Sequence, residues 1–366
     1  MKLVDEFRDP ALARALAARV VARATRPWTV MEVCGGQTHA IVAHALDALV
    51  AERIALLHGP GCPVCVTPLE TLDRAQRFAL DGGGILCTFG DMLRVPGSAG
   101  DLFAARARGA DVRVVYAPLD AARLAARTPE RPVCFLAVGF ETTAPAVAVA
   151  ARWARQQRLD NFFLLVSHVR VPPALEAIAG APDARVDAFL AAGHVCTVMG
   201  TAEYEPIARR FRKPIVATGF EPVDILHGLA LAVEQLERGE ARVEVQYERA
   251  VRPGGNPAAR ALVDEVFEVA DRAWRGVGVL PRGGLVLRAA YAALDAERAF
   301  PALADVAVAE SPECRAGEVL RGALRPPDCP AYGRRCTPEH PLGAPMVSSE
   351  GACAAYFRFR AAESAA

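Results

Sequence analysis

"FLAVGFETTAPAVAVAA", residues 135–151, joins a short apolar run to a helical pattern through a Gly-Phe-Glu turn. The same order recurs through the first 240 residues: "TVMEVC" precedes "THAIVAHALDALV", and the runs "FFLLVSH", "HVCTVM" and "PIVATGF" continue the series of expected strands. Continuous apolar strands that alternate with helices are typical of parallel sheets covered on both faces. The sequence therefore predicts an α/β fold built on parallel sheets.

The segment "IVATGFEPVDILHGLAL", residues 215–231, repeats this order around a second Gly-Phe-Glu. Two related α/β units would explain the echo, although turns between strands and helices often look alike. After residue 240 the pattern changes, because residues 257–274 read as one helix and proline, glycine and cysteine dominate from residue 311. We expect two similar parallel-sheet domains and a smaller irregular domain at the C-terminus, with bounds 1–125, 126–240 and 241–366.

The composition argues against several classes of function. The 366 residues carry a formal net charge of zero and no basic block, which gives no electrostatic reason to expect nucleic acid or an anionic membrane as a partner. No apolar run reaches the roughly 20 residues that a membrane span needs. The N-terminal 24 residues read as a charged amphipathic helix rather than a signal peptide. We expect a soluble, cytoplasmic protein.

Ten cysteines are many for such a protein. In a reducing compartment, clustered cysteines are more often metal ligands or redox thiols than structural disulfides. Cys87, Cys134 and Cys196 lie inside apolar, strand-like runs and are expected to be buried as small hydrophobes. The other seven lie in turn-rich sequence, where a thiol gains little from burial.

Cys34 follows an expected strand and precedes a Gly-Gly turn and a helix. Ligands bind at this edge of open α/β sheets, and the positive end of a helix favours a thiolate. Gly35 and Gly36 allow a tight turn and leave space beside the sulfur. Cys34 is therefore a candidate functional thiol. His39 could reach the same place, although a lone histidine is more often a surface or capping residue.

Cys62 and Cys65 form a Cys-Pro-Val-Cys motif, whose spacing suits either a disulfide or a shared metal ion. Residues 67–70, Thr-Pro-Leu-Glu, read as the capped start of a helix, where thiol pKa values fall. A four-cysteine zinc site would need a second pair nearby, so the motif favours a redox dithiol. Its loop should open onto the same sheet edge as the loop of Cys34.

Four further cysteines lie near the C-terminus with intervals of 14, 6 and 16 residues: Cys314, Cys329, Cys336 and Cys353. These intervals do not fit a zinc finger, whose ligands come in close pairs. Four thiolates held by irregular loops suit a [4Fe–4S] cluster. The alternative is that they are scattered structural cysteines.

Six blocks of the sequence together resemble one family: "MEVCGGQTHAI", "HGPGCPVCVTP", "FGDMLRVPGS", "VGFETTAP", "TGFEPVDIL" and "CTPEHPLGAPMVSSEGACAAY". In this order, from about residue 30 to residue 357, they resemble the HypD family of [NiFe]-hydrogenase maturation factors. The resemblance implies a scaffold that holds iron with the small chaperone HypC while two cyanides and one carbon monoxide are attached. It also implies cyanide delivery through HypE, with HypF upstream, and transfer of the Fe(CN)2CO unit to the hydrogenase large subunit.

The resemblance also implies roles for individual residues. Cys34 would hold the iron together with a cysteine of HypC, and Cys62 and Cys65 would be the redox dithiol. His39 and Asp91 match motif positions near this site. The four C-terminal cysteines would ligate a [4Fe–4S] cluster in a third domain. On this interpretation the protein is an assembly scaffold rather than an enzyme.

The chain departs from the family pattern at three positions. Gln37 stands where the family commonly has histidine, which argues against an obligatory proton relay there. Ala316 and Pro345 stand where many relatives carry cysteine, which leaves the four cysteines that a [4Fe–4S] cluster needs.

Two other functions use the same residues. A ferredoxin-linked disulfide reductase would use the cluster and the dithiol but would leave Cys34 without a role. A zinc-binding structural protein would use cysteines without redox chemistry. A nucleotide-binding role is weak, because no GxGxxG or P-loop motif occurs between an expected strand and helix.

Overall fold

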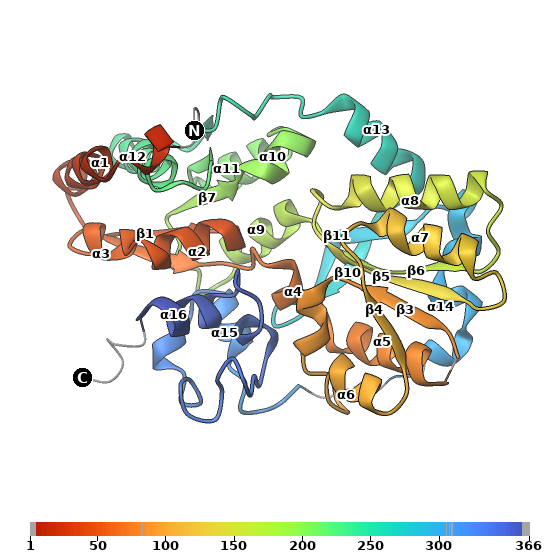
Figure 1. Cartoon of the computed structure of the whole chain (residues 1–366). Helices are drawn as coiled ribbons and strands as arrows, with labels where there is room; N and C mark the ends of the chain where they lie inside the picture. The colour runs from red at the N-terminus through yellow and green to blue at the C-terminus, as the bar shows by residue number, and fades with distance from the viewer. Residues whose placement is uncertain (1–4, 82, 305, 307, 309, 361–366) are drawn as a thin grey trace.

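A computed structural model of the protein describes residues 5–81, 83–304, 306, 308 and 310–360. Two parallel sheets lie side by side and helices cover them (Figure 1). Sheet A has the order β2 (Ile54–His58), β1 (Trp28–Glu32), β7 (Ala188–Ala192), β8 (Ile215–Thr218) and β9 (Val243–Val245). Sheet B has the order β4 (Asp111–Val114), β3 (Ile85–Thr88), β5 (Val133–Gly139) and β6 (Phe162–His168). The predicted α/β fold with parallel sheets is confirmed.

The helices between these strands cover both faces of the sheets. The α-helices that precede β9 in the sequence are α1 (Pro10–Arg23), α2 (Gly35–Ala43), α3 (Leu46–Val50), α4 (Pro63–Val66), α5 (Leu69–Asp81), α6 (Leu102–Ala107), α7 (Pro118–Arg127), α8 (Ala144–Gln156), α9 (Val171–Ala179), α10 (Gly193–Met199), α11 (Glu205–Phe211) and α12 (Pro222–Arg238). Two short 3-10 helices accompany them, η1 (Asp5–Arg8) and η2 (Gly90–Arg94). Helices α1 and α12 pack together over sheet A, and α7 and α8 cover one face of sheet B (Figure 1).

The rest of the described chain contains one antiparallel hairpin and short helices. The hairpin is β10 (Phe267–Trp274) with β11 (Gly278–Leu287). The helices are α13 (Pro257–Val266), η3 (Ala289–Leu294), α14 (Ala296–Ala299), η4 (Pro301–Leu303), α15 (Ala316–Leu320), η5 (Pro326–Asp328), η6 (Ala344–Met346) and α16 (Ala352–Arg360).

The alternation of side chains along β5 explains why its whole sequence is apolar. All seven of its residues are buried, and successive side chains of a strand point to opposite faces of the sheet. Cys134 and Leu136 lie in a core that also contains Phe189 of sheet A, whereas Phe135 and Ala137 lie in a second core under α7 and α8. One core thus joins the two sheets, and sheet B also has a core of its own.

The two sheets are not consecutive along the chain. Strands β1 and β2 belong to sheet A, the chain then forms all of sheet B, and it returns to sheet A with β7, β8 and β9. The predicted boundary at residue 125 therefore does not coincide with the strand pairing, because β3 pairs with both β4 and β5. The echoing Gly-Phe-Glu turns follow β5 and β8, so they lie in different sheets.

Three local expectations were wrong. The expected helix over 257–274 ends at Val266, and residues 267–274 form β10, because pairing with β11 decides the conformation of this stretch. "HVCTVM" belongs to helix α10, and the strand is the preceding "AFLAA". The isolated strand expected after residue 240 is β9, the edge of sheet A.

The residues after 310 lie beneath α2 in Figure 1, where α16 packs against α2. Arg360 donates to the carbonyl of Val42 in α2 (3.4 Å) and to the carboxylate of Asp47 in α3 (2.5 Å), which fixes α16 to these two helices. No helix in the described part of the chain is long and apolar enough to cross a membrane.

Candidate functional site

Cys34 is the N-cap residue of α2 and lies two positions after the end of β1 at Glu32. The neighbouring strand β2 leads into the loop of Cys62, and β1 and β2 pair in parallel up to Glu32 and His58. The two loops touch, since the amide of Gly35 donates to the carbonyl of Gly61 at 2.9 Å. The prediction that both loops share one sheet edge is therefore confirmed.

The Cys34 thiol is buried, with 1% of the residue exposed. Burial raises the pKa of this thiol well above its usual range, and the carboxylates of Glu32 and Glu350 raise it further. The backbone amides of Gln37 and Gly36 face the sulfur and act in the opposite direction. The expectation that the helix end favours the thiolate is thus correct in sign, but burial outweighs it in the metal-free protein.

A histidine that sequence analysis did not identify lies beside this sulfur. His194 Nδ1 is 3.7 Å from Cys34 Sγ, and its ring packs against Phe220 with centroids 5.2 Å apart. Burial lowers the pKa of His194 to about 4, so the ring is neutral at physiological pH. His194 lies in the first turn of α10, after β7. The pattern that could have identified it is a glycine and a histidine directly after a strand. The sequence analysis instead predicts a strand for the segment that contains His194.

The two glycines after Cys34 have different surroundings. A Cβ on Gly35 would lie 2.5 Å from Cβ of Glu350, so the space there is occupied. A Cβ on Gly36 would meet only Phe220 at 3.4 Å and Cys34 Sγ at 3.8 Å, which are ordinary contacts. Of the two positions, only Gly36 has the space beside the sulfur that the sequence suggested for both.

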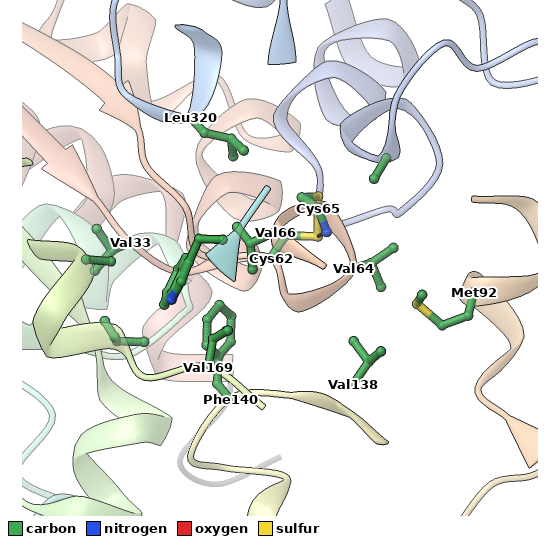
Figure 2. Packing of buried hydrophobic residues seen from close by; sticks show 14 of the residues in the cluster. Val33, Cys62, Val64, Cys65, Val66, Met92, Val138, Phe140, Val169 and Leu320 are labelled. Atoms are coloured by element: carbon green, nitrogen blue, oxygen red, sulfur yellow. Dashed lines mark hydrogen bonds between the residues drawn. A yellow bond between two sulfur atoms is a disulfide. The ribbon is translucent and has the colours of Figure 1, made fainter. Parts of the chain in front are cut away.

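Cys62 and Cys65 form a disulfide, with Cα atoms 5.2 Å apart. Both residues are buried in the core that joins the two sheets, near Val138 and Phe140 at the end of β5 (Figure 2). Cys62 is the N-cap of the short helix α4, and the amide of Cys65 donates to Cys62 Sγ at 3.2 Å. The chain thus places a redox-capable pair at the junction of the sheets.

The start of the helix expected at residues 67–70 differs from the prediction. Thr67 instead ends α4 and donates its hydroxyl to the carbonyl of Pro63 at 2.9 Å. Helix α5 begins at Leu69. The cysteine pair is therefore part of an additional helical turn rather than of a loop.

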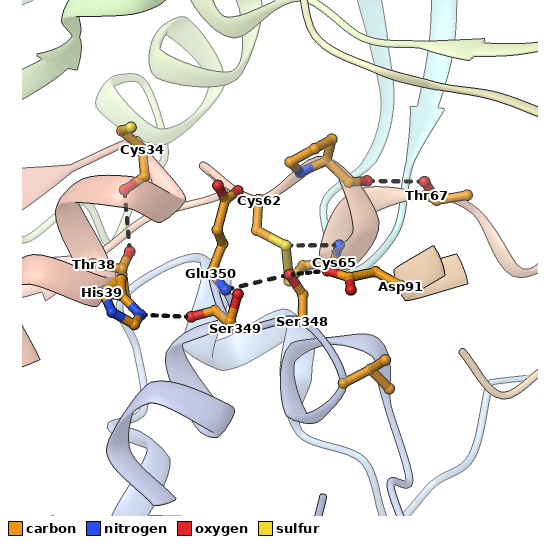
Figure 3. The surroundings of a disulfide bond; sticks show 12 residues. Cys34, Thr38, His39, Cys62, Cys65, Thr67, Asp91, Ser348, Ser349 and Glu350 are labelled. Atoms are coloured by element: carbon orange, nitrogen blue, oxygen red, sulfur yellow. Dashed lines mark hydrogen bonds between the residues drawn. A yellow bond between two sulfur atoms is a disulfide. The ribbon is translucent and has the colours of Figure 1, made fainter. Parts of the chain in front are cut away.

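The segment around Glu350 approaches both cysteine sites. Figure 3 shows its side chain rising between Cys34 and the disulfide, and burial together with Asp91 raises the pKa of the carboxyl. Ser348 donates to Asp91 Oδ2 at 3.2 Å, so the C-terminal segment also contacts η2 at the edge of sheet B. Asp91, a predicted site residue, thus lies at this junction.

The structure directs His39 and Gln37 away from the sulfur of Cys34. His39 Nδ1 lies 3.2 Å from the carbonyl of Ser349, and its ring meets Phe359 edge to face. Gln37 is fully buried and donates to Thr218 Oγ1 at 2.5 Å, which holds α2 against sheet A. Both residues therefore fix the position of α2.

The four C-terminal cysteines converge on one pocket. Cys314 precedes α15, Cys329 follows η5, Cys336 forms an isolated bridge with Tyr332, and Cys353 lies in α16. All four line the same pocket, together with the apolar residues Val319, Ala331, Leu342, Pro345 and Met346. Burial, followed by the nearby charges of the other three cysteines, raises the pKa of the Cys353 thiol. Residues separated by up to 39 positions thus meet at one place.

The donor set of this pocket, four thiols among apolar residues, is of the kind that holds an iron–sulfur cluster. A tetrahedral zinc ion, with Zn–S bonds of about 2.3 Å, would hold its sulfurs roughly 3.8 Å apart. Among the described residues no group of three or more His, Cys, Asp or Glu side chains is arranged to hold one ion. The amide of Leu342 points at Cys336 Sγ at 3.4 Å, a contact that tunes cluster sulfurs in other proteins.

Arg275 lies between this pocket and the disulfide. Its backbone amide donates to the carbonyl of Val66 at 2.8 Å, at the end of α4. Its guanidinium pairs with Glu310 at 2.8 Å, and its charge lowers the pKa of Cys314 against the larger effect of burial. Helix α4 also packs against η6, which forms part of the pocket wall. The wall of the cysteine pocket therefore contacts the helix that carries the disulfide.

The chain matches a known protein family over nearly its whole length. The HypD family, described as "Hydrogenase formation hypA family", matches residues 11–360. The hydrogenase maturation factor HypD of Azotobacter vinelandii is 47% identical over 98% of this chain and 97% of its own. The proteins of the same name from Escherichia coli K12 and Rhodobacter capsulatus are each 44% identical over the full length of both chains.

Proposed function

Because this chain belongs to the HypD family and is a hydrogenase maturation factor, we propose that it holds an iron ion at Cys34 while the Fe(CN)2CO unit is assembled. The supporting observation is the placement of Cys34. A single thiol at a helix N-terminus faces two backbone amides and lies next to the loop of a redox-capable cysteine pair. One sulfur leaves most of the ligand positions of an iron ion to cyanide, carbon monoxide and a partner protein.

Thiolate is the appropriate donor for this iron. Soft, electron-rich sulfur suits a metal that also carries ligands accepting π-electron density. The buried thiol holds its proton firmly in the metal-free protein, and an iron ion that replaces the proton compensates for burial and for the repulsion of Glu32 and Glu350. Iron binding at Cys34 thus releases a proton and stabilises the thiolate.

The proposed partners follow from the incomplete coordination of the iron. HypC would contribute a second cysteine in a stable complex, and HypE, supplied by HypF, would deliver the cyanides. The hydrogenase large subunit would receive the finished unit. Delivery requires access to Cys34, so the layer formed by His194, Phe220 and Glu350 would have to move aside.

The cysteine pair would exchange electrons with the assembly reaction. Two electrons and two protons convert the Cys62–Cys65 disulfide into two thiols, and the reverse reaction releases them. The carboxyl groups of Asp91 and Glu350 lie at the same junction and are candidate proton carriers.

The four converging cysteines, Cys314, Cys329, Cys336 and Cys353, would hold a [4Fe–4S] cluster. When bound, this group supplies electrons one at a time. The chain itself provides the apolar pocket, the amide of Leu342 directed at one sulfur and the charge of Arg275 near another. The contact between η6 and α4 places the pocket wall directly against the disulfide helix.

Infrared spectroscopy tests the proposal, because cyanide and carbonyl stretches lie where proteins do not absorb. The protein co-purified with HypC should show these bands. Cys34→Ala should abolish them, whereas Cys87→Ala, which changes a fully buried cysteine of β3, should retain them. Bands that persist in Cys34→Ala would place the iron elsewhere.

The close approach of the disulfide helix to the four-cysteine pocket also favours a second candidate, a ferredoxin-linked disulfide reductase. This enzyme would reduce a protein substrate through Cys62 and Cys65 and would not need Cys34. Disulfide turnover that is unchanged in Cys34→Ala, combined with no iron-ligand bands in the wild type, would favour the reductase.

A further inference from the structure

A buried hydrogen-bonded network extends from the loop of Cys34 towards the C-terminal cysteines. It begins at Glu32, which is completely buried and whose Oε2 accepts the backbone amide of Cys34 at 2.8 Å. Its other oxygen, Oε1, accepts the hydroxyl of Thr38 at 2.5 Å and lies 2.8 Å from His58 Nδ1. One carboxylate therefore holds three groups, and two of them belong to the turn that presents Cys34.

His58 continues the network across the sheet edge. Its Nδ1 donates to the Glu32 carboxylate, which leaves Nε2 for a second hydrogen bond. The hydroxyl of Tyr356 lies 3.3 Å from Nε2, and the two rings meet edge to face with centroids 5.5 Å apart. The hydrogen bonds of Glu32, His58 and Tyr356 are therefore continuous, although His58 and Tyr356 are 298 positions apart in the sequence.

Tyr356 connects this network to two segments that carry C-terminal cysteines. It lies in α16, one helical turn after Cys353. Its hydroxyl also interacts with Arg325, which directly precedes η5 and lies four positions before Cys329. The position of these segments is therefore linked to the backbone amide of Cys34.

We propose that Glu32, His58 and Tyr356 are positioning residues that couple the accessibility of Cys34 to the arrangement of the C-terminal cysteines. The proposal rests on the proposed function only in treating Cys34 as the iron-holding thiol and the four cysteines as a cluster site. The network requires no proton transfer. Buried polar networks that are fully paired specify one geometry, and loss of one member loosens the rest.

Tyr356→Phe removes one hydroxyl and leaves every charge in place. The matched control is Tyr332→Phe in the same region: Tyr332 lines the cysteine pocket, and its buried hydroxyl has no hydrogen-bond partner among the described residues. The measurement is the rate at which iodoacetamide alkylates Cys34 in the full-length protein, followed by mass spectrometry of the Cys34 peptide. We expect Tyr356→Phe to raise this rate about fivefold, as loss of one net hydrogen bond implies, and Tyr332→Phe to leave it within twofold.

Cys87 and Cys134, buried in sheet B, separate local loosening from general destabilisation. Their alkylation should be unchanged in Tyr356→Phe. Equal Cys34 rates in the two tyrosine variants would overturn the proposal, and so would a parallel rise at Cys87 and Cys134. This comparison is decisive whether or not the purified protein carries a cluster.

Removal of the cluster with ferricyanide and a chelator provides a second comparison. In the wild type and in Tyr332→Phe, removal should speed Cys34 alkylation, because the segments of Tyr356 and Arg325 lose their anchor. In Tyr356→Phe, removal should add no more than twofold, since two changes in one network are not additive. Equal factors in all three proteins would refute the coupling. None of these readouts uses iron-ligand bands, so a failure here leaves the infrared test of the proposed function intact.

Discussion

The two sulfur sites are built differently. One lies at the edge of sheet A and has the single thiol of Cys34, and the other is the pocket of the four C-terminal cysteines. Cys34 is a single thiol whose position is set by a strand, a helix N-terminus and a buried carboxylate. The other four cysteines come from short helices and turns and meet only in three dimensions. A regular α/β edge fixes one ligand and leaves the other positions open, whereas converging loops can surround a group completely.

This difference indicates which site suits a transient ligand and which suits a permanent one. A metal held by one protein sulfur can accept new ligands and can leave. A cluster held by four sulfurs has no protein ligand position left and is a resident group. Under the proposed function, the protein would therefore separate assembly from electron supply, with the disulfide helix α4 against the wall of the cysteine pocket.

The largest effect is expected from removing one of the four cysteines of the C-terminal pocket. Cys353→Ala should abolish the visible charge-transfer absorbance of protein purified without oxygen, because three sulfurs no longer complete the ligand set. Cys87→Ala serves as the control and should keep the colour. An unchanged spectrum in Cys353→Ala would remove this cysteine from the proposed cluster.

Acid should destabilise the sheet-edge site through His194. Its pKa is about 4 in the folded, metal-free protein and about 6.5 when unfolded, so the unfolded state binds more protons between these values. Stability should therefore fall as the pH drops from 6.5 to 4, by roughly 3 kcal/mol from this residue. Urea unfolding of the wild type and of His194→Gln measures the difference. The same pH slope in both proteins would contradict the assignment.

The two glycines beside Cys34 should respond differently to the same substitution. Gly35→Ala would place a methyl group 2.5 Å from Cβ of Glu350 and should cost about 2 kcal/mol of unfolding free energy. Gly36→Ala meets nothing closer than 3.4 Å and should change it by less than about 0.5 kcal/mol. Thermal or urea unfolding of both variants checks this, and equal losses would show that the Glu350 segment does not pack as described.

Glu350→Gln should have a smaller effect, on the reactivity of the Cys34 thiol. The carboxylate of Glu350 raises the pKa of Cys34, so its removal lowers that pKa and increases the thiolate fraction at any pH below it. Alkylation of Cys34 at fixed pH should become a few times faster. Glu339→Gln, at an exposed position, is the control. An alkylation rate equal to that of the control would show that the carboxylate of Glu350 does not act on the Cys34 sulfur.

Much of the fold could be predicted from patterns within single segments. Continuous apolar strands between helices indicated parallel sheets. Cys87 and Cys134 in these strands are buried as expected, and so is Cys196, although it lies in helix α10. The common edge of Cys34 and Cys62 followed from two successive strand–helix units. These predictions needed only local periodicity and the geometry of parallel strands.

The rest depended on contacts between distant residues. The chain returns to sheet A after completing sheet B, and nothing within β1 or β7 indicates that they pair. His194 and Glu350 reach Cys34 from 160 and 316 positions away, and the role of Glu32 appears only when His58 and Tyr356 meet. Such polar contacts carry no periodic signal, so tertiary packing alone reveals them.

The central claim is that one iron is held at Cys34 and a separate cluster is held by the C-terminal cysteines. Mössbauer spectroscopy of the protein labelled with ⁵⁷Fe and co-purified with HypC distinguishes the two irons by their electronic states. We predict a low-spin signal beside that of a [4Fe–4S] cluster in the wild type, and loss of the low-spin signal alone in Cys34→Ala. A low-spin signal that survives in Cys34→Ala, or loss of both signals together, would contradict the claim.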